Sequence, residues 1–294
     1  MEHLHCHNST PNIALNPDAR TSGFTSFRPA RGRRLALRWA FPRMDNFWLN
    51  ELLKAIVLYG SAYFLGLWVI KRGVRVNYTR KIFHFILFFF PLFLADHLPF
   101  RASVTTTLLS GLMFLLCIGT FIRPLRAKSA FLSTAYAAID RPEDRPFTLL
   151  WVSTQVVATY LVIVLMVLWL AQYGKQPLIY IAVLVAGIGD GLAEPVGVRF
   201  GKRKYRVKAL FTDRSYTRSL EESACVFLSA ILAILILRPQ FSETQLLLAF
   251  AIVPIAMTLA EAFSPHTWDG PFLYLVGGLS LVGVLELSGM IQNA

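Results

Sequence analysis

Charged residues are scarce in this sequence. Only 16% of its 294 residues are Asp, Glu, Lys or Arg, and 55% are hydrophobic. A soluble domain of this length carries roughly a quarter charged residues, so an ordinary soluble fold is excluded. Several apolar segments reach about 20 residues, enough to cross a bilayer core of about 30 Å. The sequence therefore predicts an all-α, polytopic integral membrane protein.

Other absences narrow the possible function. The three cysteines, Cys6, Cys117 and Cys225, lie far apart, which fits neither a disulfide framework nor a cysteine-ligated metal. The chain has no GxxxxGK[ST] motif, which disfavours a P-loop ATPase. The two halves show no convincing internal repeat, although many ion-coupled transporters are built from such repeats.

Acidic residues are fewer than basic ones, 17 against 29, and the formal net charge is +12. A nucleic-acid partner is one reading of this charge. The better reading is that Lys and Arg set membrane topology, because such residues collect in cytoplasmic loops. We therefore expect no nucleic-acid partner, and we expect some of the basic groups to bind a phosphorylated ligand.

The apolar segments predict about eight transmembrane helices. They run approximately over 47–70, 82–100, 103–122, 148–172, 177–198, 219–237, 244–263 and 270–290. The links at 71–81, 123–147 and 199–218 hold five, five and eight basic residues, whereas the alternating links hold about one each. The basic links are thus expected on the cytoplasmic side, or on the stromal or matrix side in an organelle.

Residues 1–43 differ from the rest, with seven arginines against two acidic residues. An Arg-rich, acid-poor leader is typical of a transit peptide. A start at Met44 or a disordered basic tail are the other readings. The alternation of basic links places this segment on the opposite side of the membrane, where seven arginines would break the rule that Lys and Arg collect on the cytoplasmic side. This conflict favours removal of the segment or a start at Met44. We expect one membrane-embedded catalytic domain over 44–294.

Two carboxylates interrupt the apolar segment 177–198. Asp190 and Glu194 are four residues apart, so a helix places them on one face. Neighbouring glycines allow close approach of a backbone or a ligand. Carboxylates near the end of a membrane helix suit Mg²⁺ that also holds nucleotide phosphates. The alternative is a buried pair that only fixes helix packing with a basic neighbour such as Arg199.

The segment that follows these carboxylates is strongly basic. Its cations and glycines make a plausible polyphosphate cradle, although many such loops only set topology or bind anionic lipid head groups. The candidate phosphate-binding residues here are Gly189, Gly191, Gly197, Gly201, Lys202 and Lys204.

Polar residues also mark the ends of other apolar segments. Arg80, Lys81 and His84 begin the segment 82–100, where the His is a candidate general base or phosphate contact and otherwise an interfacial residue. Ser219 precedes the segment 219–237 as a predicted helix cap, with Glu222 at the capping-box position. On the eight-helix topology these groups reach one membrane face, which predicts one active site there; the remaining candidates are Arg218, Glu221, Glu261 and Asp269.

Taken together, these elements resemble a family. RKIFH, GDGLAEPVGVRFGK, RSLEESACVF and an acidic pair at 261 and 269 are similar to motifs of the CTP-dependent lipid-alcohol kinases. This group includes phytol, farnesol and dolichol kinases and CTP-dependent diacylglycerol kinase, and is distantly similar to phosphatidate cytidylyltransferases. The resemblance covers roughly residues 70–275. The chain has Arg218, Glu222 and Gly270 where the family usually has Lys, Gly and Asn.

The resemblance implies phosphoryl transfer from Mg²⁺–CTP to a membrane-dissolved lipid alcohol. It implies metal binding by Asp190, Glu261 and Asp269, and phosphate contacts from Lys202 and Lys204. His84 or Glu194 would orient or deprotonate the alcohol. The alternatives are a phosphatidate cytidylyltransferase that makes CDP-diacylglycerol, an ion-coupled transporter that uses the carboxylates, and a non-catalytic lipid-binding scaffold.

Overall fold

The computed structural model describes residues 45–210 and 212–293, so the predicted leader at 1–43 lies outside the described residues. The described chain is a bundle of helices with one two-stranded hairpin. Within it, six helical segments are long and apolar enough to cross a membrane. The prediction of an all-α membrane bundle is thereby confirmed at this level. Two of the eight predicted segments form shorter helices of 16 and 17 residues.

The first group of helices contains α2 (Asp45–Arg72), α3 (Val76–His97), α4 (Val104–Gly119), α5 (Arg123–Lys128) and α6 (Ala130–Ala137). Gly73 has a φ of +65° and ends α2, and its N–H donates to the carbonyl of Val69 at 3.1 Å. Glycine adopts this left-handed conformation without steric cost, so the chain turns back at once into α3. Helix α2 packs against both α3 and α6 around a core that includes Leu58, Phe83 and Tyr136.

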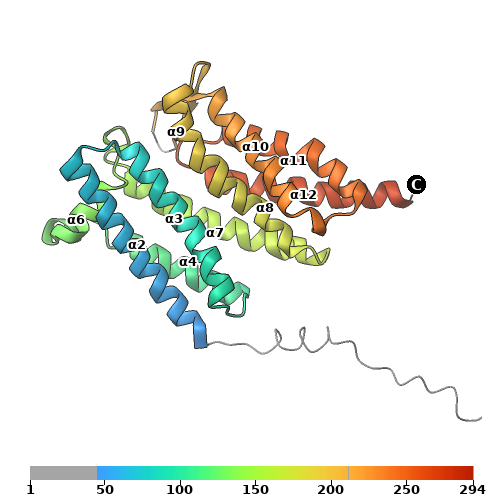
Figure 1. The fold of residues 1–294 in the computed structure, drawn as a ribbon, viewed down its shortest axis with the longest axis horizontal. Helices are drawn as coiled ribbons and strands as arrows, with labels where there is room; N and C mark the ends of the chain where they lie inside the picture. The colour runs from blue at the N-terminus through green and yellow to red at the C-terminus, as the bar shows by residue number, and fades with distance from the viewer. Residues whose placement is uncertain (1–44, 211, 294) are drawn as a thin grey trace, which may run out of the picture. The chain divides into compact units, whose positions relative to one another are not determined.

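The second group contains α7 (Thr148–Gln172), α8 (Ile179–Leu184), α9 (Gly191–Phe200), α10 (Leu220–Ile236), α11 (Glu243–Phe263) and α12 (Asp269–Asn293). A π-helical turn, η4 (Val185–Asp190), joins α8 to α9. The two core helices α10 and α11 pack against each other, and α12 contacts both α11 and α7. Figure 1 shows α7 between the helices α2–α4 and the other helices of the second group.

The predicted basic loop at 199–218 contains regular structure. Its strands β1 (Lys204–Lys208) and β2 (Ser215–Ser219) pair antiparallel, with Lys204 opposite Ser219 and Arg206 opposite Thr217. Alternate residues of a strand face opposite sides, so the exposed cations of β1 share one face while Val207 is buried on the other. The cations at 204, 206 and 208 therefore form one row instead of a flexible loop.

The hairpin is attached to the link between α11 and α12. The N–H of His266 in this link donates to the carbonyl of Lys208 at 2.9 Å. The side chain of Ser219 at the end of β2 accepts from the N–H of Glu222 at 3.3 Å and so caps α10, as the sequence predicts. These bonds hold the hairpin over the end of the bundle where α9 ends and α10 and α12 begin.

Candidate active site

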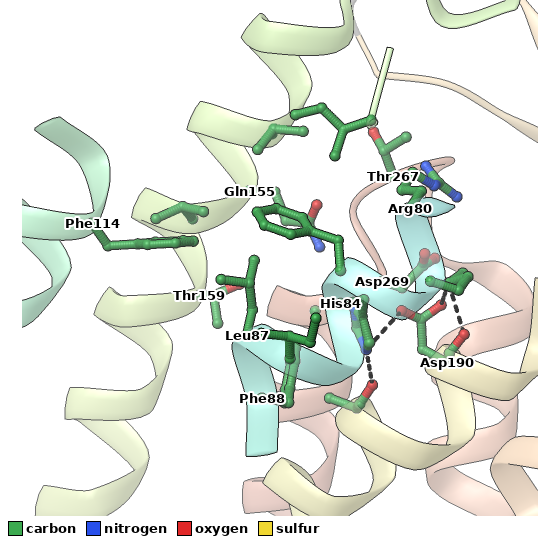
Figure 2. A pocket seen from close by; sticks show the side chains of 18 of the residues that line it. Arg80, His84, Leu87, Phe88, Phe114, Gln155, Thr159, Asp190, Thr267 and Asp269 are labelled. Atoms are coloured by element: carbon green, nitrogen blue, oxygen red, sulfur yellow. Dashed lines mark hydrogen bonds and ion pairs between the residues drawn. The ribbon is translucent and has the colours of Figure 1, made fainter. Parts of the chain in front are cut away.

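One cavity of about 930 Å³ collects most of the charged candidates. Figure 2 shows this cavity, with Arg80, His84, Asp190 and Asp269 on one side and Phe114 of α4 on the other. The predicted site residues that line it are Arg80, Lys81, His84, Asp190, Glu194, Arg218, Glu261 and Asp269. They come from five segments of the chain, so the expected convergence at one end of the helices is present.

Asp190 and Glu194 lie on one helical face, and basic groups of α3 meet them there. The Nζ atom of Lys81 is 3.0 Å from Oδ1 of Asp190 and 2.7 Å from its carbonyl oxygen. The guanidinium of Arg80 donates to Oε2 of Glu194 at 2.5 Å. Buried charge in a membrane segment requires such partners, and the pairs fix α3 against α9.

Glu194 also binds a residue that sequence reasoning missed. Arg141, in the link between α6 and α7, donates to Oε1 of Glu194 at 2.8 Å and to Oδ2 of Asp144 at 2.7 Å. The amide of Asn77 donates to the same Oε1 at 2.8 Å. Within the described residues, Glu194 thus accepts hydrogen bonds from three side chains, which makes it a poor proton acceptor.

Arg141 and Asp144 lie in the sequence RPEDRP, where two prolines flank a short turn that includes η2 (Pro142–Asp144). An Arg and an Asp three residues apart in a proline-rigid link are the signal that could have identified the pair. Burial opposes ionisation of Asp144, but the hydrogen-bonding contact with His266 and the charge of Arg141 outweigh it and hold the pKa of this carboxyl below its usual range.

His84 lines the cavity beside Asp190. Its Nε2 is 3.0 Å from the carbonyl oxygen of Ala186 and 3.9 Å from Oδ2 of Asp190, and its ring stacks on Phe88. A carbonyl oxygen only accepts hydrogen bonds, so Nε2 carries the proton and the lone pair of the neutral ring is at Nδ1. None of the hydrogen bonds found among the described residues uses this Nδ1 atom.

A second ion cluster forms around Arg218 at the end of β2. Its NH1 is 3.0 Å from Oε1 of Glu261, and its NH2 donates to Asp269. Burial opposes the charge of Arg218, but the carboxylates of Asp269 and Glu261 raise its pKa above the usual range. Ser264 donates to Asp269 at 2.6 Å and Ser223 to Glu261 at 3.1 Å, so both carboxylates have fixed orientations.

The glycines of the central motif accommodate neighbouring helices. A Cβ atom at Gly191 would lie 2.8 Å from the ring of Phe85, and one at Gly189 would lie 3.0 Å from Cα of Val226. A Cβ at Gly197 would overlap Glu222, and one at Gly201 would overlap the carbonyl of Gly197. Close packing against α3 and α10 therefore explains the glycines at 189, 191 and 197, whereas Gly201 lies against the last turn of its own helix α9. The expected phosphate contacts of these glycines remain predictions.

Several predicted phosphate contacts do not line the cavity. Lys202 is exposed in the link between α9 and β1, and Lys204 is exposed on β1. Ser219 caps α10, and Glu221 lies in the first turn of α10. Strand β2 links the cations of β1 to the cavity, because Thr217 of β2 lines the cavity and lies opposite Arg206 of β1. Cross-strand partners share a face, so the row of exposed cations on β1 lies on the same face as Thr217.

Mg²⁺ fits the site only as part of a complex with phosphates. No group of three or more His, Cys, Asp or Glu side chains in residues 45–210 and 212–293 is arranged as metal ligands. Glu261 and Asp269 are paired with Arg218, whereas Asp190 is paired with Lys81. Mg²⁺ commonly takes one or two carboxylates and fills its other positions with water and substrate phosphates. The carboxylate of Asp190, one-fifth exposed, suits that role.

No family model, curated protein or solved structure matches this chain. The resemblance to the lipid-alcohol kinases therefore stays an expectation.

Proposed function

We propose that this protein is a CTP-dependent kinase that phosphorylates a membrane-dissolved lipid alcohol. The observation that carries the proposal is the division of one cavity into a charged end and an apolar wall. Arg80, His84 and Asp190 lie at the charged end, and Leu87 and Phe114 contribute to the apolar wall. Such a cavity suits a ligand with one hydroxyl and a long hydrocarbon chain.

The charges in the cavity support a nucleotide that enters with a metal ion. The cluster at Glu194 and Asp190 has three basic members and, with Glu143 and Asp144, four acidic ones, whereas Arg218 faces two carboxylates. The cavity wall thus has no surplus of positive charge for a free polyphosphate. Mg²⁺ held by Asp190 would neutralise phosphate charge when bound, and the basic row of β1 would supply the remaining attraction.

His84 is the group we assign to proton removal. In the transfer, the alcohol oxygen forms a bond to the γ-phosphorus, the bond from that phosphorus to the bridging oxygen breaks, and CDP leaves. The hydroxyl proton passes to Nδ1 of His84, the ring atom left available by the bond from Nε2 to Ala186. Glu194 instead positions Arg80 and Arg141, because all its neighbours donate to it.

The proposed membrane arrangement follows the charge pattern. We propose that α4 and α10 also cross the membrane, completing the eight expected segments, and that the charged end faces the cytoplasm or, after an organellar import, the stroma. Three basic segments then lie on that same side of the membrane: the link between α2 and α3, the link that contains Arg141, and the hairpin. The choice of CTP over other nucleotides comes from the resemblance alone.

The test uses purified protein in detergent with Mg²⁺ and γ-labelled CTP, offered phytol, farnesol, geranylgeraniol, dolichol and diacylglycerol. We expect label in a lipid monophosphate and a loss of about 100-fold or more in kcat for Asp190→Asn. Asp96→Asn is the matched control, because Asp96 is exposed at the far end of α3. Lipid labelled from α-labelled CTP and phosphatidate would instead assign a cytidylyltransferase, and folded protein that labels no lipid would refute the kinase.

A further inference from the structure

A second polar cluster lines the same cavity far from the charged end. Glu51 and Lys54 of α2 form an ion pair, and Ser110 of α4 donates to Glu51 at 2.7 Å. Lys54 also donates to Ser110 at 2.8 Å. Within membrane helices an ion pair is costly and usually marks a functional position. The proposed transfer reaction uses none of these three groups.

The position of this cluster along the bundle follows from the pairing of α2 with α3. The side-chain amide of Asn50 donates to the carbonyl of Leu98 at 3.3 Å, which places these residues at one level. The helices are antiparallel, so His84, fourteen residues before Leu98, is level with Phe64, fourteen residues after Asn50. Lys54 is ten residues from that level, and a rise of 1.5 Å per residue gives a separation of about 15 Å.

The cavity wall between the two polar groups is mostly apolar, with Gln155 and Thr159 of α7 among its polar members. It is formed by side chains from α2, α3, α4 and α7, including Leu58, Leu87, Met113, Phe114 and Val156. A length of about 15 Å is half the thickness of a bilayer core of about 30 Å, or the depth of one leaflet. The space therefore suits one hydrocarbon chain that ends where the polar cluster begins.

We propose that Glu51, Lys54 and Ser110 set the maximum chain length of the alcohol acceptor, an inference that rests on the proposed function. A hydrocarbon chain that reached these groups would remove water from the ion pair without offering a hydrogen bond, and such desolvation is unfavourable. Acceptors with a chain of about one leaflet fit the apolar section. Long polyprenols such as dolichol exceed it and are poor substrates.

The experiment measures kcat/KM for γ-labelled CTP transfer to a series of prenyl alcohols with an increasing number of isoprene units, from farnesol to a long polyprenol. The test variant is the double substitution Glu51→Leu/Lys54→Leu, which replaces both partners and leaves no unpaired charge. Met113→Trp adds bulk to the apolar section about one turn of α4 beyond Ser110. Glu286→Leu is the matched control, because Glu286 of α12 is exposed and outside the cavity.

We expect the wild type to lose activity sharply beyond a given chain length. The double variant should raise the ratio of kcat/KM for long to short acceptors by about tenfold or more, as one or two methylenes in a pocket commonly do. Met113→Trp should move the limit to shorter chains, and Glu286→Leu should leave it unchanged.

The outcomes separate this inference from the proposed function. Wild-type protein that phosphorylates short and long acceptors equally would overturn the chain-length limit and leave the kinase intact, even if the double variant does not fold. The same holds if the limit stays in place in a folded double variant and in folded Met113→Trp. Absence of transfer to every alcohol would refute the kinase and the inference together.

Discussion

Arg141 joins two buried carboxylates that belong to different segments, Asp144 of its own link and Glu194 of α9. Removal of one partner from a buried ion pair leaves the others uncompensated. We expect Arg141→Gln to lower the free energy of unfolding by about 3 kcal/mol, measured by denaturant titration in detergent.

Arg145→Gln is the control for this change. Arg145 lies four residues further along the same link, and its side chain is 58% exposed in its pair with Asp140. An exposed pair contributes at most about 1 kcal/mol. Equal effects of the two substitutions would contradict the structural role assigned to Arg141.

Asp144 adds a pH dependence to the same group. Its pKa in the folded protein is below the usual value, so its contribution to stability is present above about pH 4, the ordinary Asp range, and is lost as the pH falls through the lower folded pKa. We expect Asp144→Asn to reduce Tm at pH 7 and the difference from wild type to shrink below about pH 4. A difference independent of pH would be inconsistent with an ionised Asp144.

His84 is the residue whose loss should affect the chemical step most directly. We expect His84→Asn to reduce kcat by about 100-fold or more while the protein stays folded, because general-base catalysis contributes at least that much. His97→Asn is the control, since His97 is exposed at the other end of α3. Wild-type kcat in His84→Asn would remove the histidine from the proposed mechanism.

At the scale of elements, α2 and α6 approach each other through Gly66. A Cβ atom there would overlap the backbone carbonyl of Thr134, which cannot rotate away as a side chain can. We expect Gly66→Ala to destabilise the protein by about 1–3 kcal/mol in thermal or denaturant unfolding.

Gly60 provides the comparison within the same helix. No atom of the described residues lies within 4 Å of a Cβ built at Gly60, so alanine there is accommodated. Alanine also has the better helix propensity, by about 1 kcal/mol. Gly60→Ala should therefore be neutral or stabilising, and destabilisation by both variants would show that α2 tolerates no added methyl group for reasons other than this contact.

At the scale of the whole molecule, the charge pattern predicts which links share a side of the membrane. We expect cysteines introduced as Lys204→Cys on the hairpin and Gln176→Cys in the link after α7 to react with an impermeant thiol reagent from opposite sides of sealed vesicles. The background would lack all three native cysteines, Cys6, Cys117 and Cys225. Labelling of both positions from one side would refute the predicted topology.

Prediction from sequence worked best where a pattern repeats along one element. Apolar length indicated the membrane helices, and the i, i+4 spacing placed Asp190 and Glu194 on one face. The N-cap at Ser219 is also confirmed, because a cap and the N–H that it binds are three residues apart and need no distant contact; the reciprocal bond of a capping box is not formed in the described chain, since the Glu222 carboxylate accepts from the Ser219 hydroxyl instead. The sequence predicts a loop for the cations of β1, and this prediction is wrong because the strand pairing depends on a partner beyond a turn.

The sequence alone determined the membrane class, the approximate helices and the grouping of charged residues at one end, since hydrophobic length and charge distribution are local properties of the chain. Only the tertiary structure decided that Arg141 pairs with Glu194 across 53 positions, that the motif glycines receive neighbouring helices, and that Glu51 and Lys54 line the cavity. Helical periodicity specifies which residues share a face of one helix. It does not specify which other helix meets that face, because that choice depends on packing among all of them.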